Sequence, residues 1–244
     1  FTATSNKNKI KKLASDVKNP VSGELMDLSD IKLGRFRLRE GGEVGALYAD
    51  RRVEKNDEGY IPYTPGQTIA TENTTPFKIG TVNPKWNLGW RHGFNYKGIN
   101  ASVMFTARIG GNVISKTQAT LDRFGVSKAS ADAREAGYVM LGNIKMKPQD
   151  YYGTIYDLDS YYVYSATNIR LQEASIGYTL PNKWFGNVVK NVNISVYGTN
   201  LWMIYNKAPY DPELTASTGT FGQGYDYFML PSSRTYGFSL KFGF

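Results

Sequence analysis

The sequence contains no cysteine and only one histidine, His92, in 244 residues. The absence of cysteine excludes disulfide scaffolds, thiolate zinc sites, iron–sulfur clusters and cysteine nucleophiles. A single histidine excludes His-rich metal sites and leaves His92 as the one candidate base for a Ser-His-Asp triad. No run approaches the roughly 18 apolar residues that a membrane-spanning helix needs, so no such helix is predicted.

The chain also lacks an initiating methionine and a leader segment, because it opens on the residues FTATSNKNKI. We therefore expect it to be a portion of a longer product. Charged residues are scarce at 20%, against about 25% in an average globular chain. Glycine (25 residues) and aromatics (4 Trp, 18 Tyr and 12 Phe) are abundant, which is typical of β-structure with many turns.

The net charge is +8, and part of it comes from a basic run near the start of the chain. The run consists of Lys7, Lys9, Lys11 and Lys12. No zinc, helix-turn-helix or aromatic RNA-binding motif accompanies it, so no nucleic-acid partner is predicted. We expect a solvated connecting segment, with contact to anionic lipid headgroups as an alternative.

Alternation of apolar and polar residues is the strongest pattern in the chain. From Trp86 to Tyr96, every second residue is apolar or aromatic apart from His92, and the residues between them are Asn, Gly and Arg. After Lys97-Gly98, the alternation resumes over Ile99–Ala107. Two alternating runs joined by a short glycine-containing turn predict a β-hairpin.

Three further alternating runs lie in the C-terminal third, at Glu173–Leu180, Val192–Thr199 and Tyr236–Phe244. Each spans about 10 residues, the length at which a tilted strand crosses a bilayer. The apolar faces carry aromatics at their ends, and the opposite faces are rich in Gly, Ser, Asn and Thr, which favours a membrane barrel with a polar lumen. A soluble antiparallel sandwich alternates in the same way and remains an alternative.

The connections between these runs are unequal in length. Lys97-Gly98 and Pro181–Asn191 are short, whereas Gly111–Asn168 and Ile204–Ser233 are long. Outer-membrane barrels have short periplasmic turns and long extracellular loops. Placing the C-terminus in the periplasm puts each of these connections on the expected side.

Two more strand segments are predicted upstream. Leu33–Arg39 is interpreted as a rising strand and Phe1–Ser5 as the end of a descending one, with Asn6–Asp30 between them in the periplasm. Together with the runs above they make seven segments. Because an odd number of strands with a cut edge cannot close as a bacterial barrel, we expect the remaining strands to come from elsewhere.

Six motifs in chain order resemble those of one known family. They are FTATSNKNKIKKL, RLREGGEVGALYADRR, IGTVNPKWNLGWRHGFNYKGINASVMFTARIGGNV, TNIRLQEASIGYTLP, VYGTNLWMIYNKAPYDPEL and the terminal LPSSRTYGFSLKFGF. Each is weakly specific alone, but their order and spacing resemble the end of the SusC/RagA class of TonB-dependent outer-membrane transporters. The stretch Lys116–Asp150 matches least, and within it Ser127–Met140 has a serine start and a composition that predict a short helix.

The resemblance implies an all-β fold: residues 1–244 would be the C-terminal segment of an antiparallel transmembrane β-barrel of about 22 strands. It further implies TonB-dependent active import of a large nutrient, a glycan or an oligopeptide, across the outer membrane of a Gram-negative, Bacteroidetes-like bacterium. The implied partners are a SusD-like surface lipoprotein acting as a lid, the TonB complex through the upstream part of the protein, outer-membrane lipid, and a dimer of transporter–lid pairs. No covalent chemistry is implied.

The resemblance also suggests a role for the last strand. Outer-membrane barrels end on alternating apolar residues with a final aromatic, which the assembly machinery recognises. The matching residues here are Tyr236, Phe238, Leu240, Phe242 and Phe244. The alternative is that these side chains only face lipid.

Clustered aromatics in the long connections are candidates for contact with substrate or lid, because tyrosine combines a flat apolar face with a polar tip. The candidates are Tyr151, Tyr152, Tyr161, Tyr162, Tyr210, Asp211, Tyr225 and Tyr227. The alternative is that each tyrosine packs the loops against one another. For the Asp211-Pro212-Glu213 segment, a structural turn is the first interpretation and partner contact the second.

Metal and catalytic sites are not predicted from the residues present. Asp150, Asp157 and Asp159 suggest at most a calcium ion in an outer loop, since the glycine and distal glutamate of an EF-hand are missing. His92 falls on the apolar face of its run, and no serine lies in a G-x-S-x-G elbow, so the chain is not predicted to be an enzyme. Two other functions stay open: a soluble glycan-binding β-sandwich, and a small autonomous outer-membrane barrel of about eight strands.

Overall fold

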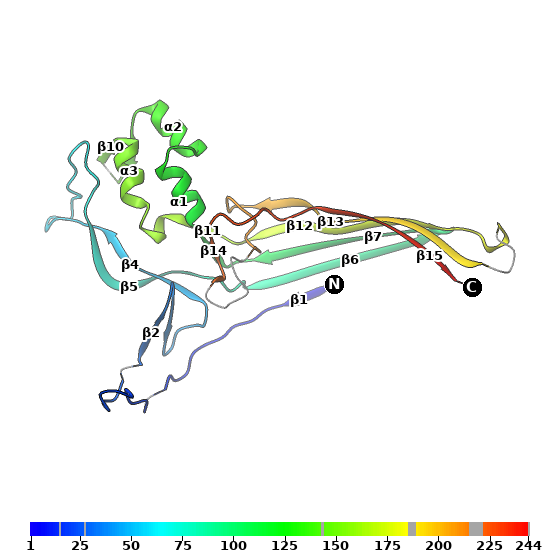
Figure 1. Cartoon of the computed structure of the whole chain (residues 1–244), viewed down its shortest axis with the longest axis horizontal. Helices are drawn as coiled ribbons and strands as arrows, with labels where there is room; N and C mark the ends of the chain where they lie inside the picture. Colours follow the sequence, from blue (N-terminus) through cyan, green and yellow to red (C-terminus); the bar gives the residue numbers. More distant parts are fainter. Residues whose placement is uncertain (15, 27, 143, 185–188, 215–221, 244) are drawn as a thin grey trace.

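The computed structural model describes residues 1–14, 16–26, 28–142, 144–184, 189–214 and 222–243. Its largest element is an antiparallel sheet of six strands that neighbour one another in chain order, hereafter the main sheet (Figure 1). The strands are β1 (Thr2–Thr4), β6 (Trp86–Tyr96), β7 (Ile99–Ile109), β12 (Asn168–Thr179), β13 (Lys190–Asn206) and β15 (Thr235–Gly243). Within the described residues, the outer edges of β1 and β15 have no strand partner, so the main sheet is an open segment.

The hairpin of β6 and β7 forms as predicted, with continuous pairing from Trp86–Ile109 to Tyr96–Ile99. Lys97 (φ 47°) and Gly98 (φ 89°) at its tip are both left-handed, the two-residue turn whose twist matches that of the adjoining strands. A Cβ at Gly98 would lie 2.8 Å from the Thr179 carbonyl oxygen, so the turn needs glycine for space as well as for conformation.

One face of the main sheet is apolar from edge to edge. Trp90 stacks on Phe105 with ring centroids 5.5 Å apart, and the register continues this face through Ile176 and Val196 to Phe238. Trp90 and Phe238 nevertheless remain 49% and 65% exposed. A β-sandwich would bury such side chains, and so broad an apolar surface marks contact with a partner or a membrane.

The opposite face of the main sheet is polar and hydrogen-bonded to itself. The hydroxyl oxygens of Ser102 and Ser175 lie 2.8 Å apart. The Asn193 amide donates to Asn100 Oδ1 and to Thr179 Oγ1, at 3.0 Å in each case. These short side chains hydrogen-bond to one another and leave the face polar. Such a face is suited to the wall of a polar lumen.

A β-bulge at Gln172 keeps the two faces in phase along β12. The pairing with β7 skips this residue between Leu171 and Glu173. Apolar residues at odd positions before the bulge and at even positions after it therefore lie on the same face of the sheet.

The long connections leave the main sheet at one end. Segments 110–167 and 207–234 join strands at the end that holds Trp86, hereafter the loop end. Segments 97–98 and 180–189 join strands at the opposite, turn end. The predicted separation of long and short connections is confirmed.

The predicted direction of the first segment is wrong. β1 runs antiparallel to β6 and leads toward the loop end, so residues 5–85 form a single connection at that end and the basic run lies there too (Figure 1). The strand predicted at Leu33–Arg39 does not lie between Phe1–Ser5 and Trp86–Tyr96, because these two segments pair directly. The seven predicted segments are corrected to the six strands of the main sheet.

Leu33–Arg39 is part of a hairpin in a second, four-stranded antiparallel sheet. Its strands are β2 (Asp30–Leu33), β3 (Phe36–Arg39), β4 (Ala46–Val53) and β5 (Thr71–Thr81). Gly34 (φ 63°) reverses the chain, and Arg37 and Arg39 both donate to Asp30. The Arg39 hydrogen bond is the main reason that the pKa of Asp30 lies below its usual value. Because β2 and β3 pair with each other across this turn, Leu33–Arg39 is not one continuous strand.

Residues 116–162 build a compact unit beside the loop end, hereafter the helical insert (Figure 1). It comprises α1 (Lys116–Arg123), α2 (Lys128–Ala136), β9 (Val139–Leu141), β10 (Ile144–Met146), α3 (Pro148–Ile155) and the 3₁₀ turn η1 (Asp159–Tyr162). Ser127 caps α2 by accepting from the Ser130 amide, and left-handed Gly137 ends it. The helix predicted within Ser127–Met140 is confirmed, although its last residues begin a strand.

Short strands tie the insert to the second long connection. β8 (Asn112–Ser115) lies between β11 (Val163–Ser165) and β14 (Tyr225–Asp226). A further 3₁₀ turn, η2 (Asn182–Trp184), lies at the turn end. None of the helices in the described residues is long and apolar enough to cross a membrane.

Buried apolar side chains gather at the loop end rather than on the main sheet. One cluster joins Phe36 and Leu47 of the second sheet to Ile114 of β8, and another packs Ala119, Tyr152 and other side chains inside the helical insert. The loop end is thus a packed body, whereas the apolar face of the main sheet depends on its surroundings for burial.

Candidate functional site

The two long connections meet at the loop end through β8. Its residue Ile114 pairs with Val163 on one side and Tyr225 on the other. The Ser115 hydroxyl donates to Asp226 at 2.7 Å, and both side chains are buried. This junction fixes the two loops relative to each other, so their exposed residues form one surface.

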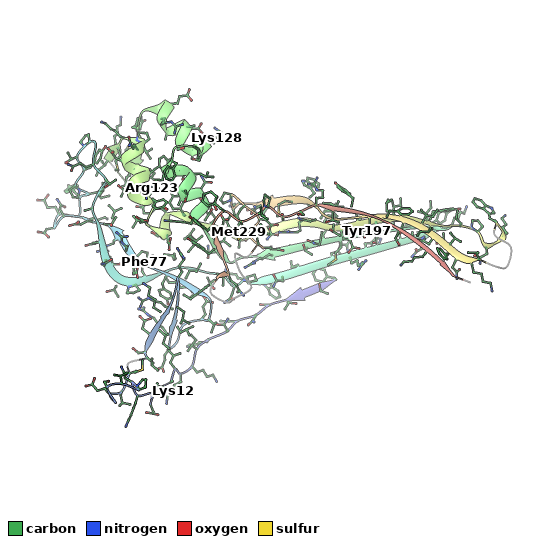
Figure 2. The ribbon with its side chains drawn as sticks, viewed as in Figure 1. Lys12, Phe77, Arg123, Lys128, Tyr197 and Met229 are labelled. Atoms are coloured by element: carbon green, nitrogen blue, oxygen red, sulfur yellow. The ribbon has the colours of Figure 1, made fainter. Side chains whose placement is uncertain are left out.

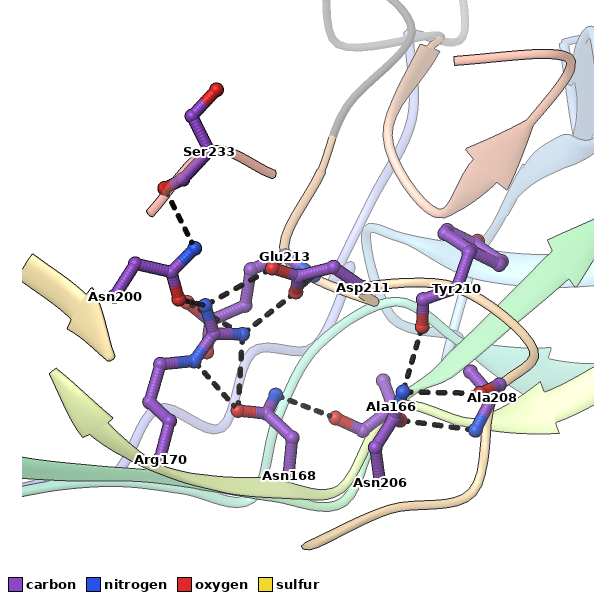
Figure 3. Close-up of polar contacts among 10 residues, drawn as sticks. All are labelled: Ala166, Asn168, Arg170, Asn200, Asn206, Ala208, Tyr210, Asp211, Glu213 and Ser233. Atoms are coloured by element: carbon purple, nitrogen blue, oxygen red, sulfur yellow. Dashed lines mark hydrogen bonds and ion pairs between the residues drawn. The ribbon is translucent and has the colours of Figure 1, made fainter. Parts of the chain in front are cut away.

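A buried ion pair anchors the second loop to the polar face of the main sheet (Figure 3). Arg170, in β12, donates from Nη2 to Asp211 Oδ1 at 2.7 Å and from Nη1 to Asp211 Oδ2 at 3.1 Å. The two side chains are only 5% and 8% exposed. Asn168 Oδ1 also accepts from Arg170 Nε and Nη2 at 3.3 Å. Such a two-point pairing fixes orientation as well as distance.

The local conformation of the Asp211-Pro212-Glu213 segment directs the Asp211 carboxylate toward Arg170. The Glu213 amide donates to Asp211 Oδ1 at 3.1 Å, which is the local turn expected of this sequence. Burial alone would raise the pKa of Asp211, but the hydrogen bonds from Arg170 and from the Glu213 amide hold it below its usual value. The carboxylate therefore stays ionised at neutral pH. This arrangement fits the first interpretation of the segment, a structural turn.

Asn206 shapes the chain just before that turn (Figure 3). Its side-chain amide donates to the carbonyl oxygens of Ala208 and Tyr210 at 3.0 and 2.8 Å, and its Oδ1 accepts from the Ala208 amide at 3.0 Å. Tyr210 is thereby turned inward, and burial raises the pKa of its phenol. Neither the Tyr210 hydroxyl nor Arg108 Nε has a hydrogen-bond partner among the described residues.

The aromatic candidates divide into buried and exposed groups. Tyr152 and Tyr162 lie in the core of the helical insert, with Tyr151 packed against them. Burial raises the pKa of Tyr162 and, with the neighbouring Tyr161 and Asp122, that of Tyr151. These phenols remain neutral and hold the insert together.

Other candidates lie nearer the surface. Tyr225 is half-buried beneath the Arg35 guanidinium, whose carbon lies 3.7 Å from the ring centroid. Tyr161 and Tyr227 are exposed, at 40% and 58%. Tyr227 meets exposed Phe228 edge-on with centroids 5.1 Å apart. A role for Tyr161 and Tyr227 in contacting substrate or lid remains a prediction, to which the structure adds Phe228.

The three candidate calcium carboxylates are engaged separately. Asp150 accepts from the Tyr63 hydroxyl and the Gly66 amide, each at 2.8 Å. Asp159 pairs with Arg35 at 2.8 Å, and Asp157 lies 3.4 Å from Lys116 Nζ. In the part of the chain that the structure describes, no group of three or more acidic or histidine side chains could hold a metal ion.

The candidate C-terminal signal lies on β15. Tyr236, Phe238, Leu240 and Phe242 alternate along the strand and are all strongly exposed, whereas Phe244 lies outside the described residues. His92 pairs with Val103 on the apolar face, 6.1 Å from the Trp90 ring. The structure thus places His92 away from the loop end, among apolar neighbours.

Sequence reasoning missed Arg170, the residue that organises the loop end. Its only local signal was a cation within an otherwise alternating strand. Its partner Asp211 lies 41 positions further along the chain, so nothing in the neighbouring sequence indicates the pairing.

Known proteins share both sequence and fold with this chain. No family model matches it. TonB-dependent receptor P3 of Formosa agariphila is 26% identical over 231 residues, which cover 84% of this chain and 23% of the receptor.

The RagAB peptide importer in its open-open state matches 94% of this chain and 25% of its own, with a TM-score of 0.62 and 17% identity. A second RagAB transporter structure matches 96% of this chain and 26% of its own, with a TM-score of 0.57 and 18% identity. The chain thus spans about a quarter of the length of these relatives.

These comparisons confirm the resemblance expected from the motifs. In sequence the chain is similar to a TonB-dependent receptor, and over 94% of its length its fold is similar to part of the RagAB importer. The chain is thus similar to part of a SusC/RagA-like transporter, and most of its regular structure is antiparallel strands. The proteins it matches are named as a receptor and importers, not as enzymes.

Proposed function

We propose that this chain forms the C-terminal part of the barrel in a transporter that imports a large nutrient across the outer membrane, driven through TonB. The carrying observation is the asymmetry of the main sheet: an exposed apolar face, a polar opposite face, short connections at one end and a packed loop body at the other. That combination is the one an outer-membrane barrel requires.

The apolar face of the main sheet would lie against lipid. Its side chains include Trp90, Ile176 and Phe238, all exposed in this chain, and β6 and β7 each have 11 residues, enough for a tilted strand to cross the hydrocarbon layer. The loop end would then face the outside of a Gram-negative cell and the turn end the periplasm.

The loop end would receive the substrate together with a SusD-like lipoprotein lid. The anchoring of the second loop by Arg170 and Asp211 gives this surface a fixed shape, and exposed Tyr161 and Tyr227 give it aromatic contacts. Preorganised aromatic surfaces bind partners and ligands with little loss of conformational entropy. Among the two substrate classes, the RagAB structures, described as peptide importers, support an oligopeptide over a glycan.

The proposal is tested in a strain that lacks the gene for the complete protein and is complemented with it. Restored, TonB-dependent uptake of labelled oligopeptides or of oligosaccharides supports import and names the substrate class. Fractionation of the complete protein with the outer membrane is also required. A complete protein that purifies without detergent would overturn the proposal in favour of a soluble glycan-binding domain. A mature membrane species of about this chain's own mass, 27.3 kDa, would favour the small autonomous barrel.

A further inference from the structure

An open cavity of about 790 Å³ lies between the three helices of the helical insert. This volume lies within the roughly 300–1,000 Å³ typical of ligand pockets. Three cationic residues line it from three different elements: Arg123 at the end of α1, Arg134 in α2, and Lys147 immediately before α3. Figure 2 shows Arg123 on the insert, beyond the end of the main sheet.

Among the ion pairs of the described residues, none involves Arg123, Arg134 or Lys147. The cavity has one carboxylate, that of Asp122, which is buried and accepts from the Gln118 amide at 2.7 Å. Three positive groups therefore surround a space that contains one negative group already engaged by a neutral donor.

Two of the cations are held in place by neutral contacts. Arg134 Nη1 donates to the Gly125 carbonyl oxygen at 2.6 Å, which fixes the guanidinium while leaving most of its five donors for other partners. The Arg123 guanidinium lies over the Tyr156 ring, 4.3 Å from its centroid, a contact that restrains the group without neutralising its charge.

The start of α3 forms one side of the cavity. Lys147 is the N-cap residue and its side chain makes no capping hydrogen bond. The nearby carboxylate of Asp150 turns away to accept from Tyr63 and Gly66. Pro148 and Gln149 of the first turn of α3 line the same cavity.

We propose that this cavity binds the carboxylate groups of an acidic oligomeric ligand. Arginine pairs with carboxylates through two parallel hydrogen bonds, and the separation of the cations on three elements suits several carboxylates on one ligand. Phe124, 72% exposed, supplies apolar contact for the rest of the ligand. An acidic peptide and a uronic-acid glycan present the same chemistry. The inference concerns ligand binding by the insert and is independent of transport.

The test is calorimetric titration of the purified complete protein, in detergent and at low salt, with four probes. Pentaglutamate and a uronic-acid pentasaccharide are the acidic probes, and pentaglutamine and inorganic phosphate are the controls. We expect one acidic probe to bind, and whichever binds identifies the source of the carboxylates. The Arg134→Gln/Lys147→Gln variant should weaken that binding by at least about tenfold, the loss expected on removing charge-assisted hydrogen bonds.

The matched control removes the same two charges from the surface of the insert. Lys128, labelled in Figure 2, and Lys145 lie outside the cavity lining, so Lys128→Gln/Lys145→Gln should bind the acidic probe as the unmodified protein does. Arg134 also donates to the Gly125 carbonyl oxygen, so its substitution could disturb the fold of the insert. The single variant Lys147→Gln leaves that hydrogen bond intact and should also weaken binding of the acidic probe. Equal binding of pentaglutamine or phosphate, no binding of either acidic probe, or equal losses in the cavity and surface variants would overturn the proposal.

Discussion

Arg170 and Asp211 form an ion pair in which both charged side chains are buried. Their side chains are 5% and 8% exposed. Each is stabilised by the other, and Asn168 accepts in addition from Arg170 while Asp211 accepts from the Glu213 amide. A pair of this kind contributes modestly to net stability when intact, but the loss of one partner leaves a buried charge uncompensated. The pair therefore acts mainly on the geometry of the loop that holds Asp211.

Substitution of Asp211 tests this at the scale of one residue. Asp211→Asn should lower the free energy of local opening around residues 207–214 by up to about 3–5 kcal/mol, because buried Arg170 keeps only Glu213, 3.6 Å away, as an anionic partner. Amide hydrogen exchange of that segment is the measurement. Asp132→Asn breaks an exposed ion pair with Lys128 and should cost only about 0.3–0.5 kcal/mol. Similar effects of the two substitutions would show that the Arg170 pair has no special role.

Asp211 should also make the stability of the loop at residues 207–214 depend on pH. The pKa of Asp211 is lower in the folded protein than its usual value of 3.8, so protonation favours the open loop. Protection of residues 207–214 should be full above pH 4 and should fall as the pH drops below about 4 toward the folded pKa. Exchange rates corrected for their intrinsic pH dependence measure this, and the decline should be absent in Asp211→Asn.

Arg170 also shows where prediction from sequence stops. The Asp211-Pro212-Glu213 turn was predictable because its hydrogen bond is local. Its ion pair was not, because the partner is distant in the chain. Likewise, nothing in the sequence separates buried Tyr152 from exposed Tyr227, since both lie in aromatic clusters and only tertiary packing distinguishes them.

At the scale of elements, the strands of the main sheet were predictable because a period of two fixes which side chains face outward. The exceptions have physical causes. β5 was missed because it is rich in threonine and interrupted by Pro76, which hides its alternation. Leu33–Arg39 alternates in the manner of a strand but closes on itself through left-handed Gly34.

The bulge in β12 provides a test of an element. Deletion of Gln172 removes the extra residue and shifts Ile169 and Leu171 onto the polar face of the sheet. We expect the complete protein to reach the outer membrane at a strongly reduced level, measured by heat-modifiable mobility in membrane fractions. Gln172→Ala retains the extra residue and should assemble normally. If the deletion variant assembles as well as Gln172→Ala, the bulge does not determine which face of the sheet Ile169 and Leu171 occupy.

The whole molecule is divided into a packed loop end and a sheet that lacks a core of its own. Buried apolar clusters join the second sheet, the helical insert and β8, whereas the main sheet exposes Trp90 and Phe238. The stability of the sheet must therefore come from what lies against it. Within the described residues its two edge strands also lack partners.

A pair of neighbouring substitutions tests what lies against the main sheet. Phe238→Arg places a charge on the apolar face, and Ser239→Arg places the same charge on the polar face. A membrane against the apolar face predicts a cost of up to about 2–4 kcal/mol for the first and little for the second. Equilibrium refolding of the complete protein into vesicles measures both. Equal costs would argue against a lipid-facing surface.

The helical insert begins and ends on neighbouring strands, since Ile114 of β8 pairs with Val163 of β11. No strand pairing of the main sheet in the described residues involves residues 116–162, so we expect exchange of the insert to leave the register of that sheet unchanged. In a transporter of the proposed kind, exchange of residues 116–162 would change the cavity of the insert and leave the strands of the main sheet unchanged. Chimeras that exchange this insert would be a practical route to barrels with altered selectivity.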